Sequence, residues 1–176
     1  MQFKLSNVFG LFVVANTALT VNVATSLDGY SALAKDVDTT AQKIQFIDSY
    51  ETGPQTINAY YKLDKAENKG YQEFKGGSVP TDEQQAACNS YTNFASVLTT
   101  TLKTTVGKHE IIEATGLTHQ MAATLRSVES VTDEIGSTLI KDLLPSCGDS
   151  LKNTKKSLDK TLQDAIDAYD TVLPLI

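Results

Sequence analysis

The chain has 176 residues, of which 41% are hydrophobic, and its formal net charge at pH 7 is −6. This length suffices for one domain with a substantial core, and the acidic charge argues against a nucleic-acid partner because phosphates repel it. The sequence contains no Gly-x-Ser-x-Gly elbow, phosphate-binding glycine loop or metalloprotease helix motif. It therefore argues against an enzyme, and we expect no cofactor.

Residues 1–20 have the organisation of a secretory signal peptide. A short positive start ends at Lys4, a mainly apolar run follows, and small residues suit cleavage within residues 18–24. The alternative, a transmembrane anchor, needs roughly 20 apolar residues, whereas two asparagines interrupt this run. We therefore expect residues 25–176 to be a single secreted, extracellular domain without a transmembrane anchor. Loss of Lys4 would take its net charge to −7.

The chain has two cysteines, Cys88 and Cys147. Passage through an oxidising compartment favours a disulfide between them, and the alternative is two buried free thiols. A closed loop of about 60 residues would stabilise the fold by roughly 4 kcal/mol through the entropy of the unfolded chain.

Five stripes of apolar residues at steps of three and four predict five helices, and no strand is convincing. The first stripe runs from Tyr30 to Ile47, and we expect this helix to end near Tyr50. The second helix should begin at residues 51–54, since glycine suits a helix C-cap and proline suits a first turn. We expect it to fray or kink near Gly70.

The third stripe, residues 81–106, has the clearest helical pattern. Thr81 is followed three residues later by Gln84, a capping-box pattern that predicts the start of the helix at Thr81. The face that we expect to be buried consists of Cys88, Tyr91, Ala95, Leu98, Leu102 and Thr105.

The last two stripes complete the chain. After a connector at 107–116 with room for a short helical turn, the fourth stripe runs over 121–143 until Pro145 stops it. The fifth begins at about Asp149 and ends before Pro174. Helices of roughly 20 to 27 residues with short connections predict an all-α fold, an antiparallel bundle of about five amphipathic helices.

The interior of this bundle is the candidate binding site. Small side chains next to large ones on the third and fourth stripes favour an elongated apolar gap, to which Ala122 and Ala123 would contribute; the alternative is a fully packed core. Buried tyrosines and threonines are compatible with a ligand-binding gap and with a packed core, because their hydroxyls can hydrogen-bond to the backbone or to a ligand's polar head. The candidate ligand-binding residues are Tyr91, Ala95, Leu98, Leu125, Val128 and Ile135.

Two polar groupings on the surface have ordinary explanations. His109, Glu113 and His119 are candidate metal ligands, but three such residues around a loop are typical of solvated surface, and we expect no metal. A set of four lysines on the last helix could bind an acidic headgroup, but aspartates interleave with them, which is typical of a solvated helix face. It consists of Lys152, Lys155, Lys156 and Lys160.

The order of these parts resembles the hydrophobic surface-binding protein A family, which includes fungal cell-wall galactomannoproteins. The runs that carry the resemblance are LAKDVDTTAQKIQFID (33–48), VPTDEQQAA (79–87), HQMAATLRSVESVTDEIGSTLIKDLLP (119–145) and LDKTLQDAIDAYD (158–170). The cysteine pair departs from the simplest family pattern. The resemblance covers essentially the whole chain after the signal peptide.

This resemblance implies a secreted or wall-associated helical domain that adsorbs to hydrophobic surfaces or encloses a fatty acid in an apolar tunnel. We therefore expect a non-catalytic protein whose partner is a fatty acid, another apolar ligand or a hydrophobic surface. The alternatives are a structural wall protein, an effector that binds a host protein, and a hydrolase.

Overall fold

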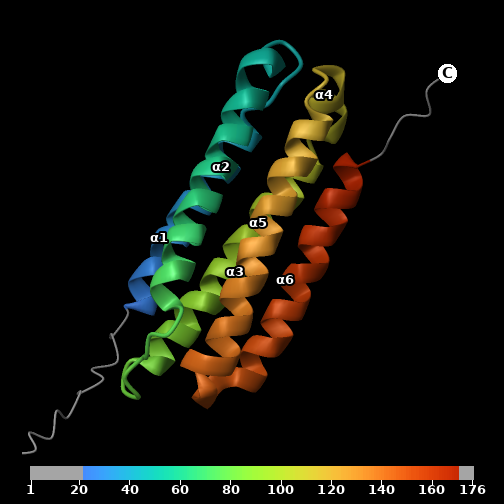
Figure 1. Ribbon diagram of the computed structural model, residues 1–176. Coiled ribbons are helices and arrows are strands. Elements are labelled where there is room, and N and C mark those ends of the chain that lie inside the picture. Colours follow the sequence, from blue (N-terminus) through green and yellow to red (C-terminus); the bar gives the residue numbers. More distant parts are fainter. Residues whose placement is uncertain (1–21, 171–176) are drawn as a thin grey trace, which may run out of the picture.

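The structure, a computed structural model, describes residues 22–170 (Figure 1). Most of these residues lie in helices. They are α1 (Val23–Gln42), α2 (Ser49–Phe74), α3 (Gln84–Val106), α4 (His109–Ala114), α5 (Thr118–Thr138) and α6 (Gly148–Tyr169). A π-helical turn (Leu139–Leu143) and a 3-10 turn (Pro145–Cys147) link the last two helices. Within these residues there is no β-strand and no helix long and apolar enough to span a membrane. The predicted all-α bundle is confirmed. The predicted signal peptide and Pro174 lie outside the described residues.

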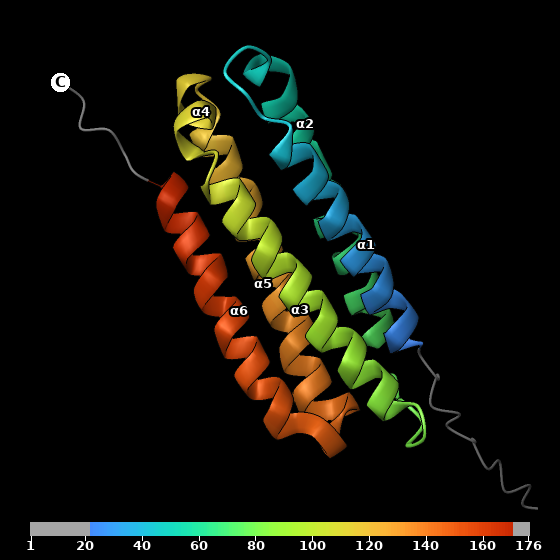
Figure 2. The same cartoon turned by 180° about the vertical axis from the view of Figure 1, so that it is seen from behind.

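The five long helices form a closed ring. Going round it, α1 packs on α2, α2 on α5, α5 on α6, α6 on α3 and α3 on α1 again. Figures 1 and 2 show α2 and α5 on one face of the molecule, α1 and α3 on the opposite face, and α6 along one edge. Because each helix turns its apolar stripe inward, the ring encloses one shared interior.

A disulfide joins Cys88, in the first turns of α3, to Cys147, just before α6. The two Cα atoms are 6.5 Å apart, and the bond closes a loop of 59 residues. The predicted pairing is confirmed. It holds the start of α3 against the turn that reverses the chain between α5 and α6.

The connection between α1 and α2 differs from the prediction. The turn occupies residues 43–48, whereas residues 51–54 lie inside the first turns of α2. Gly53 is buried there under the side chain of Leu117, whose Cδ1 atom would lie only 2.9 Å from a Cβ at this position. Glycine at this position therefore permits close helix packing, and it does not end a helix. Ile47, expected on a buried stripe, is 93% exposed.

Two further expectations were wrong. Gly70 neither frays nor kinks α2, which continues to Phe74, because the side chain of Tyr30 fills the space that a Cβ would occupy. The capping box at Thr81 is not formed, and α3 begins at Gln84. The Gln84 side chain instead donates to the carbonyl of Val79 and accepts from Ser146, so tertiary contacts use the amide that the cap requires.

Candidate functional site

The six candidate ligand residues all lie in the bundle interior. Tyr91, Ala95 and Leu98 come from α3 and the other three from α5, and none is more than 3% exposed. The helices α3 and α5 are not neighbours in the ring, since α3 packs on α1 and α6 whereas α5 packs on α2 and α6. Their buried faces therefore meet only across the interior. Ala122 is buried as expected, but Ala123 is exposed and cannot contribute.

Most of the interior is apolar and comes from all five long helices. Among the fully buried large side chains are Leu27, Leu63, Phe94, Leu98, Leu102 and Met121. Grooves lie in the seams between helices at the surface. One of about 430 Å³ runs between α3 and α6, where Thr92, Ala95, Ser96, Thr99, Asn153, Thr154 and Ser157 line it. Ala95 is thus the candidate residue that connects the interior to this seam.

A polar layer crosses the interior near α4, and its tyrosine and threonine hydroxyls are well paired. The Tyr60 and Thr105 hydroxyls lie 2.9 Å apart, and the Tyr169 hydroxyl donates to the Thr105 carbonyl at 2.6 Å. The Thr101 hydroxyl donates to the carbonyls of Ala34 and Val97. The threonines in this layer therefore bond backbone and tyrosine groups, which stabilises the contact between α1, α2, α3 and α6.

Glu67 is the unusual residue of the interior. It lies on α2, is fully buried, and accepts a hydrogen bond from the Thr132 hydroxyl of α5, 3.3 Å from Oε1. Within residues 22–170 it has no ion pair with a basic group. Burial raises the pKa of Glu67 well above its usual value, the bond from Thr132 opposes this, and the charge of Asp64 adds to it. Glu67 therefore keeps its proton at pH values where an exposed glutamate is ionised.

The Tyr91 hydroxyl is a second unusual polar group of the same interior. It reaches from α3 to α5, where a Cβ on Gly136 would lie 2.6 Å from it. Within the described residues it has no hydrogen-bond partner. Burial raises the pKa of Tyr91, and the charges of Asp159, Asp133 and Glu67 raise it further. It is therefore a neutral donor, and it faces the candidate residues of α5 across the bundle.

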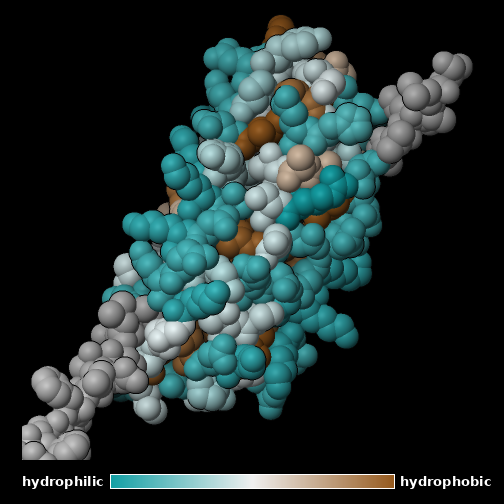
Figure 3. Space-filling model, in the orientation of Figure 1, coloured by the Kyte–Doolittle hydropathy of each residue, from teal (hydrophilic) through white to brown (hydrophobic). Residues whose placement is uncertain are grey.

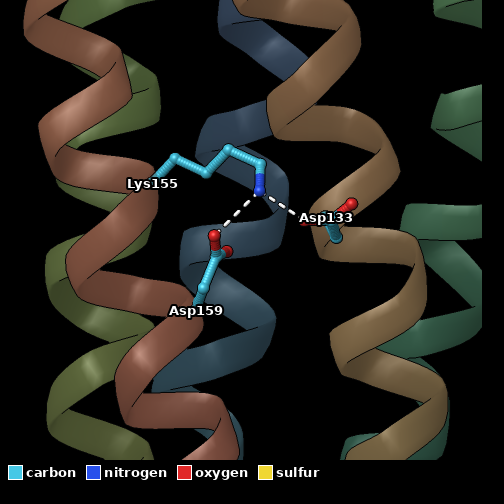
Figure 4. Close-up of polar contacts among 3 residues, drawn as sticks. All are labelled: Asp133, Lys155 and Asp159. Atoms are coloured by element: carbon cyan, nitrogen blue, oxygen red, sulfur yellow. Dashed lines mark hydrogen bonds and ion pairs between the residues drawn. The ribbon is translucent and has the colours of Figure 1, made fainter.

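The side chain of Lys155, on α6, lies over the contact between the Tyr91 hydroxyl and Gly136. Its Cδ and Cε atoms would lie 3.2 and 3.3 Å from a Cβ on Gly136. Its ammonium group pairs with Asp133 of α5 and, at 2.8 Å, with Asp159 of its own helix (Figure 4). Burial alone would lower the pKa of Lys155, but the hydrogen bonds and charges of the two aspartates raise it. The cation therefore closes the α5–α6 seam next to the Tyr91 hydroxyl.

Tyr30 of α1 makes a corresponding contact with α2. Its ring packs edge-on against Phe94 at 5.9 Å, and its hydroxyl rests on Gly70, one turn beyond Glu67. Burial and the charges of Glu67 and Glu73 raise the pKa of Tyr30, against an opposing effect of Ser26. Two tyrosines, from α1 and α3, thus end on glycines of α2 and α5, each about one turn from the Glu67–Thr132 contact.

Sequence reasoning missed Glu67, although a signal was present. It falls within a regular series of buried positions on α2: Thr56, Tyr60, Leu63, Glu67, Gly70 and Phe74. Steps of three and four place all six on one face of the helix. A glutamate at such a position is seldom fully buried without a partner. The run of exposed charges around it concealed this signal.

The surface groups behave as ordinary polar residues. Lys152 and Lys160 pair with Asp149 and Asp164 on their own helix, and Lys155 makes the contacts described above. Within the described residues, no group of three or more His, Cys, Asp or Glu side chains could hold a metal ion. Tyr61, an aromatic residue of α2, is 59% exposed.

The fold is similar to three solved structures. AfMP4p in complex with palmitic acid superimposes with a TM-score of 0.78 at 13% identity, over 84% of this chain and 97% of that one. Ligand binding domain 1 of the Penicillium marneffei MP1 protein, complexed with arachidonic acids, gives 0.76 at 16% identity, over 85% and 98%. Domain 2 of the same protein, complexed with multiple arachidonic acids, gives 0.75 at 13% identity, over 84% and 94%. No protein-family model and no curated protein sequence matches the chain.

Proposed function

We propose that this protein is a secreted or wall-associated, non-catalytic binder of a single-chain lipid, a fatty acid or a close analogue, which it encloses inside the ring of helices. The observation that carries the proposal is the similarity of the whole bundle to three structures that contain palmitic or arachidonic acid. The apolar interior, lined by five helices, supports it. The elongated shape of that interior matches an extended acyl chain.

The energetics are sufficient for useful affinity. Each methylene transferred from water contributes about 0.8 kcal/mol, and micromolar binding needs about 8 kcal/mol after the cost of immobilising the ligand. A fully enclosed chain of sixteen carbons contributes about 13 kcal/mol, which leaves about 8 kcal/mol after an immobilisation cost of about 4 to 5 kcal/mol, without a strong headgroup contact. A chain of twelve carbons should bind more weakly. The chain would enter by displacing buried side chains, and the α3–α6 seam at Ala95 is the route that the grooves favour.

Titration of delipidated protein with dodecanoic acid tests the proposal. We expect saturable binding by calorimetry and a mass increase of whole ligands by native mass spectrometry. Butyric acid is the matched control, because it has the same carboxyl group without the chain, and it should not bind. Absence of binding for every acid from twelve to twenty carbons would favour the structural-wall or effector alternatives.

A second role is favoured by the turn between α1 and α2. Phe46, Ile47 and Tyr50 are 69%, 93% and 78% exposed there, and such a group of apolar side chains marks an interaction surface. Figure 3 shows a mostly hydrophilic face with apolar surface at the end of the bundle that carries this turn. We infer that these three residues mediate adsorption to hydrophobic surfaces.

The double substitution Phe46→Ser and Ile47→Ser should reduce retention on an octyl matrix several-fold while leaving thermal stability nearly unchanged, because these side chains bury little area. The matched control is Tyr61→Ser, an exposed aromatic residue on the side of α2. Equal losses in both proteins would mean that adsorption does not depend on the turn.

A further inference from the structure

The polar groups of the interior are unequally satisfied. Within the described residues four buried polar atoms lack a hydrogen-bond partner: the hydroxyls of Tyr30 and Tyr91, Oδ1 of Asp38 and Nε2 of His109. Near α4, the hydroxyls of Tyr60, Thr105 and Tyr169 all take part in hydrogen bonds. At the level of Glu67, in contrast, the Tyr91 hydroxyl has no partner among the described residues. An unpaired buried donor costs free energy, which a ligand group that accepts its hydrogen bond recovers.

The unpaired donor and the buried acid lie close together along α5. Glu67 contacts Thr132, whereas the Tyr91 hydroxyl lies against Gly136, four residues further along the same helix. Four residues of α-helix rise about 6 Å. Both side chains are fully buried. A hydroxyl or carboxyl group that displaced the apolar atoms between them would be within reach of both.

We propose that Glu67, Thr132 and Tyr91 form the seat for the polar head of the bound lipid, and that this head is uncharged, a protonated carboxyl or a hydroxyl group. The inference rests on the proposed function, because the chain of the same ligand must occupy the apolar interior. The Tyr91 O–H and the O–H of protonated Glu67 donate to the head, and the second oxygen of Glu67 accepts from it. No bond is made or broken.

The charges around the seat disfavour an anionic head. The titratable groups facing it are Asp64 on α2, Asp133 on α5, Asp159 and Lys155 on α6, and Tyr30 on α1, with Glu73 beside Tyr30. All but Lys155 and Tyr30 are acids, and Lys155 is already paired with two of them. A carboxylate placed here would therefore meet like charges and lose its water without gaining a free cation.

The experiment compares dodecanoic acid with 1-dodecanol, titrated into the delipidated full chain between pH 5 and pH 8. If the head is bound uncharged, the affinity for the acid falls up to tenfold per pH unit above the pKa of the acid in water. The affinity for the alcohol stays constant until Glu67 itself ionises, and Glu67→Gln removes that later fall. At pH 8 the alcohol should bind more tightly than the acid.

Tyr91→Phe tests the seat directly. Loss of one hydrogen bond should weaken binding of 1-dodecanol roughly 2- to 12-fold. Tyr61→Phe, which removes an exposed hydroxyl from α2, should leave the affinity unchanged. Since Tyr91→Phe removes only an unpaired hydroxyl, the variant should fold.

The outcomes separate this inference from the proposed function. Suppose that the natural protein binds both ligands. The proposed head site is then overturned if Tyr91→Phe binds the alcohol equally well, or if the natural protein binds the acid equally at pH 5 and pH 8. In either case lipid binding itself stands. If the natural protein binds neither ligand, both the proposed function and the seat are overturned.

Discussion

Replacing Leu98 or Leu125 with tryptophan should abolish binding of dodecanoic acid in protein that remains folded. Both leucines are fully buried in the bundle interior, Leu98 on α3 and Leu125 on α5. An indole ring there would occupy volume that the acyl chain needs. We expect at least a hundredfold loss of affinity, because several methylenes at about 0.8 kcal/mol each would be left in water.

Overpacking of a core typically costs 1–3 kcal/mol, so folding must be checked by cooperative thermal unfolding. The matched controls are Thr100→Trp on α3 and Ala123→Trp on α5, which place the same ring on exposed positions of the same helices. They should bind as tightly as the natural protein. Unchanged affinity in both folded leucine variants would show that the acyl chain does not lie between α3 and α5.

Reduction of the Cys88–Cys147 disulfide should lower the free energy of unfolding by about 4 kcal/mol, because a 59-residue loop is released in the unfolded chain. For a domain of this size the melting temperature should fall by roughly 10 °C. Denaturant unfolding of the same protein with and without dithiothreitol measures the difference, without any change of side chain.

The double variant Cys88→Ala and Cys147→Ala provides the comparison for this experiment. In the absence of reductant it should unfold at nearly the same denaturant concentration as the reduced protein, and dithiothreitol should not affect it. A difference below 1 kcal/mol between the oxidised and reduced forms would mean that the unfolded chain is already constrained, so that the loop model does not apply.

Helix content was predictable because it depends on local periodicity. The stripes of three- and four-residue steps correctly predicted five long helices, the short turn in 107–116 and the end of regular α-helix before Pro145. Boundaries that depended on single glycine, proline or cap residues were less reliable. Gly53 and Gly70 lie inside α2 because side chains from other helices, Leu117 and Tyr30, need the space of a missing Cβ.

Most buried helix faces and the cysteine pair could be predicted from the sequence, since amphipathic spacing and an even cysteine count are properties of the chain alone. Which buried faces meet depends on the tertiary structure. It brought Glu67 of α2 to Thr132 of α5, and Tyr91 of α3 to Gly136 of α5, contacts between residues more than 40 positions apart. Such pairings depend on the order of helices around the ring, and helical periodicity carries no information about that order.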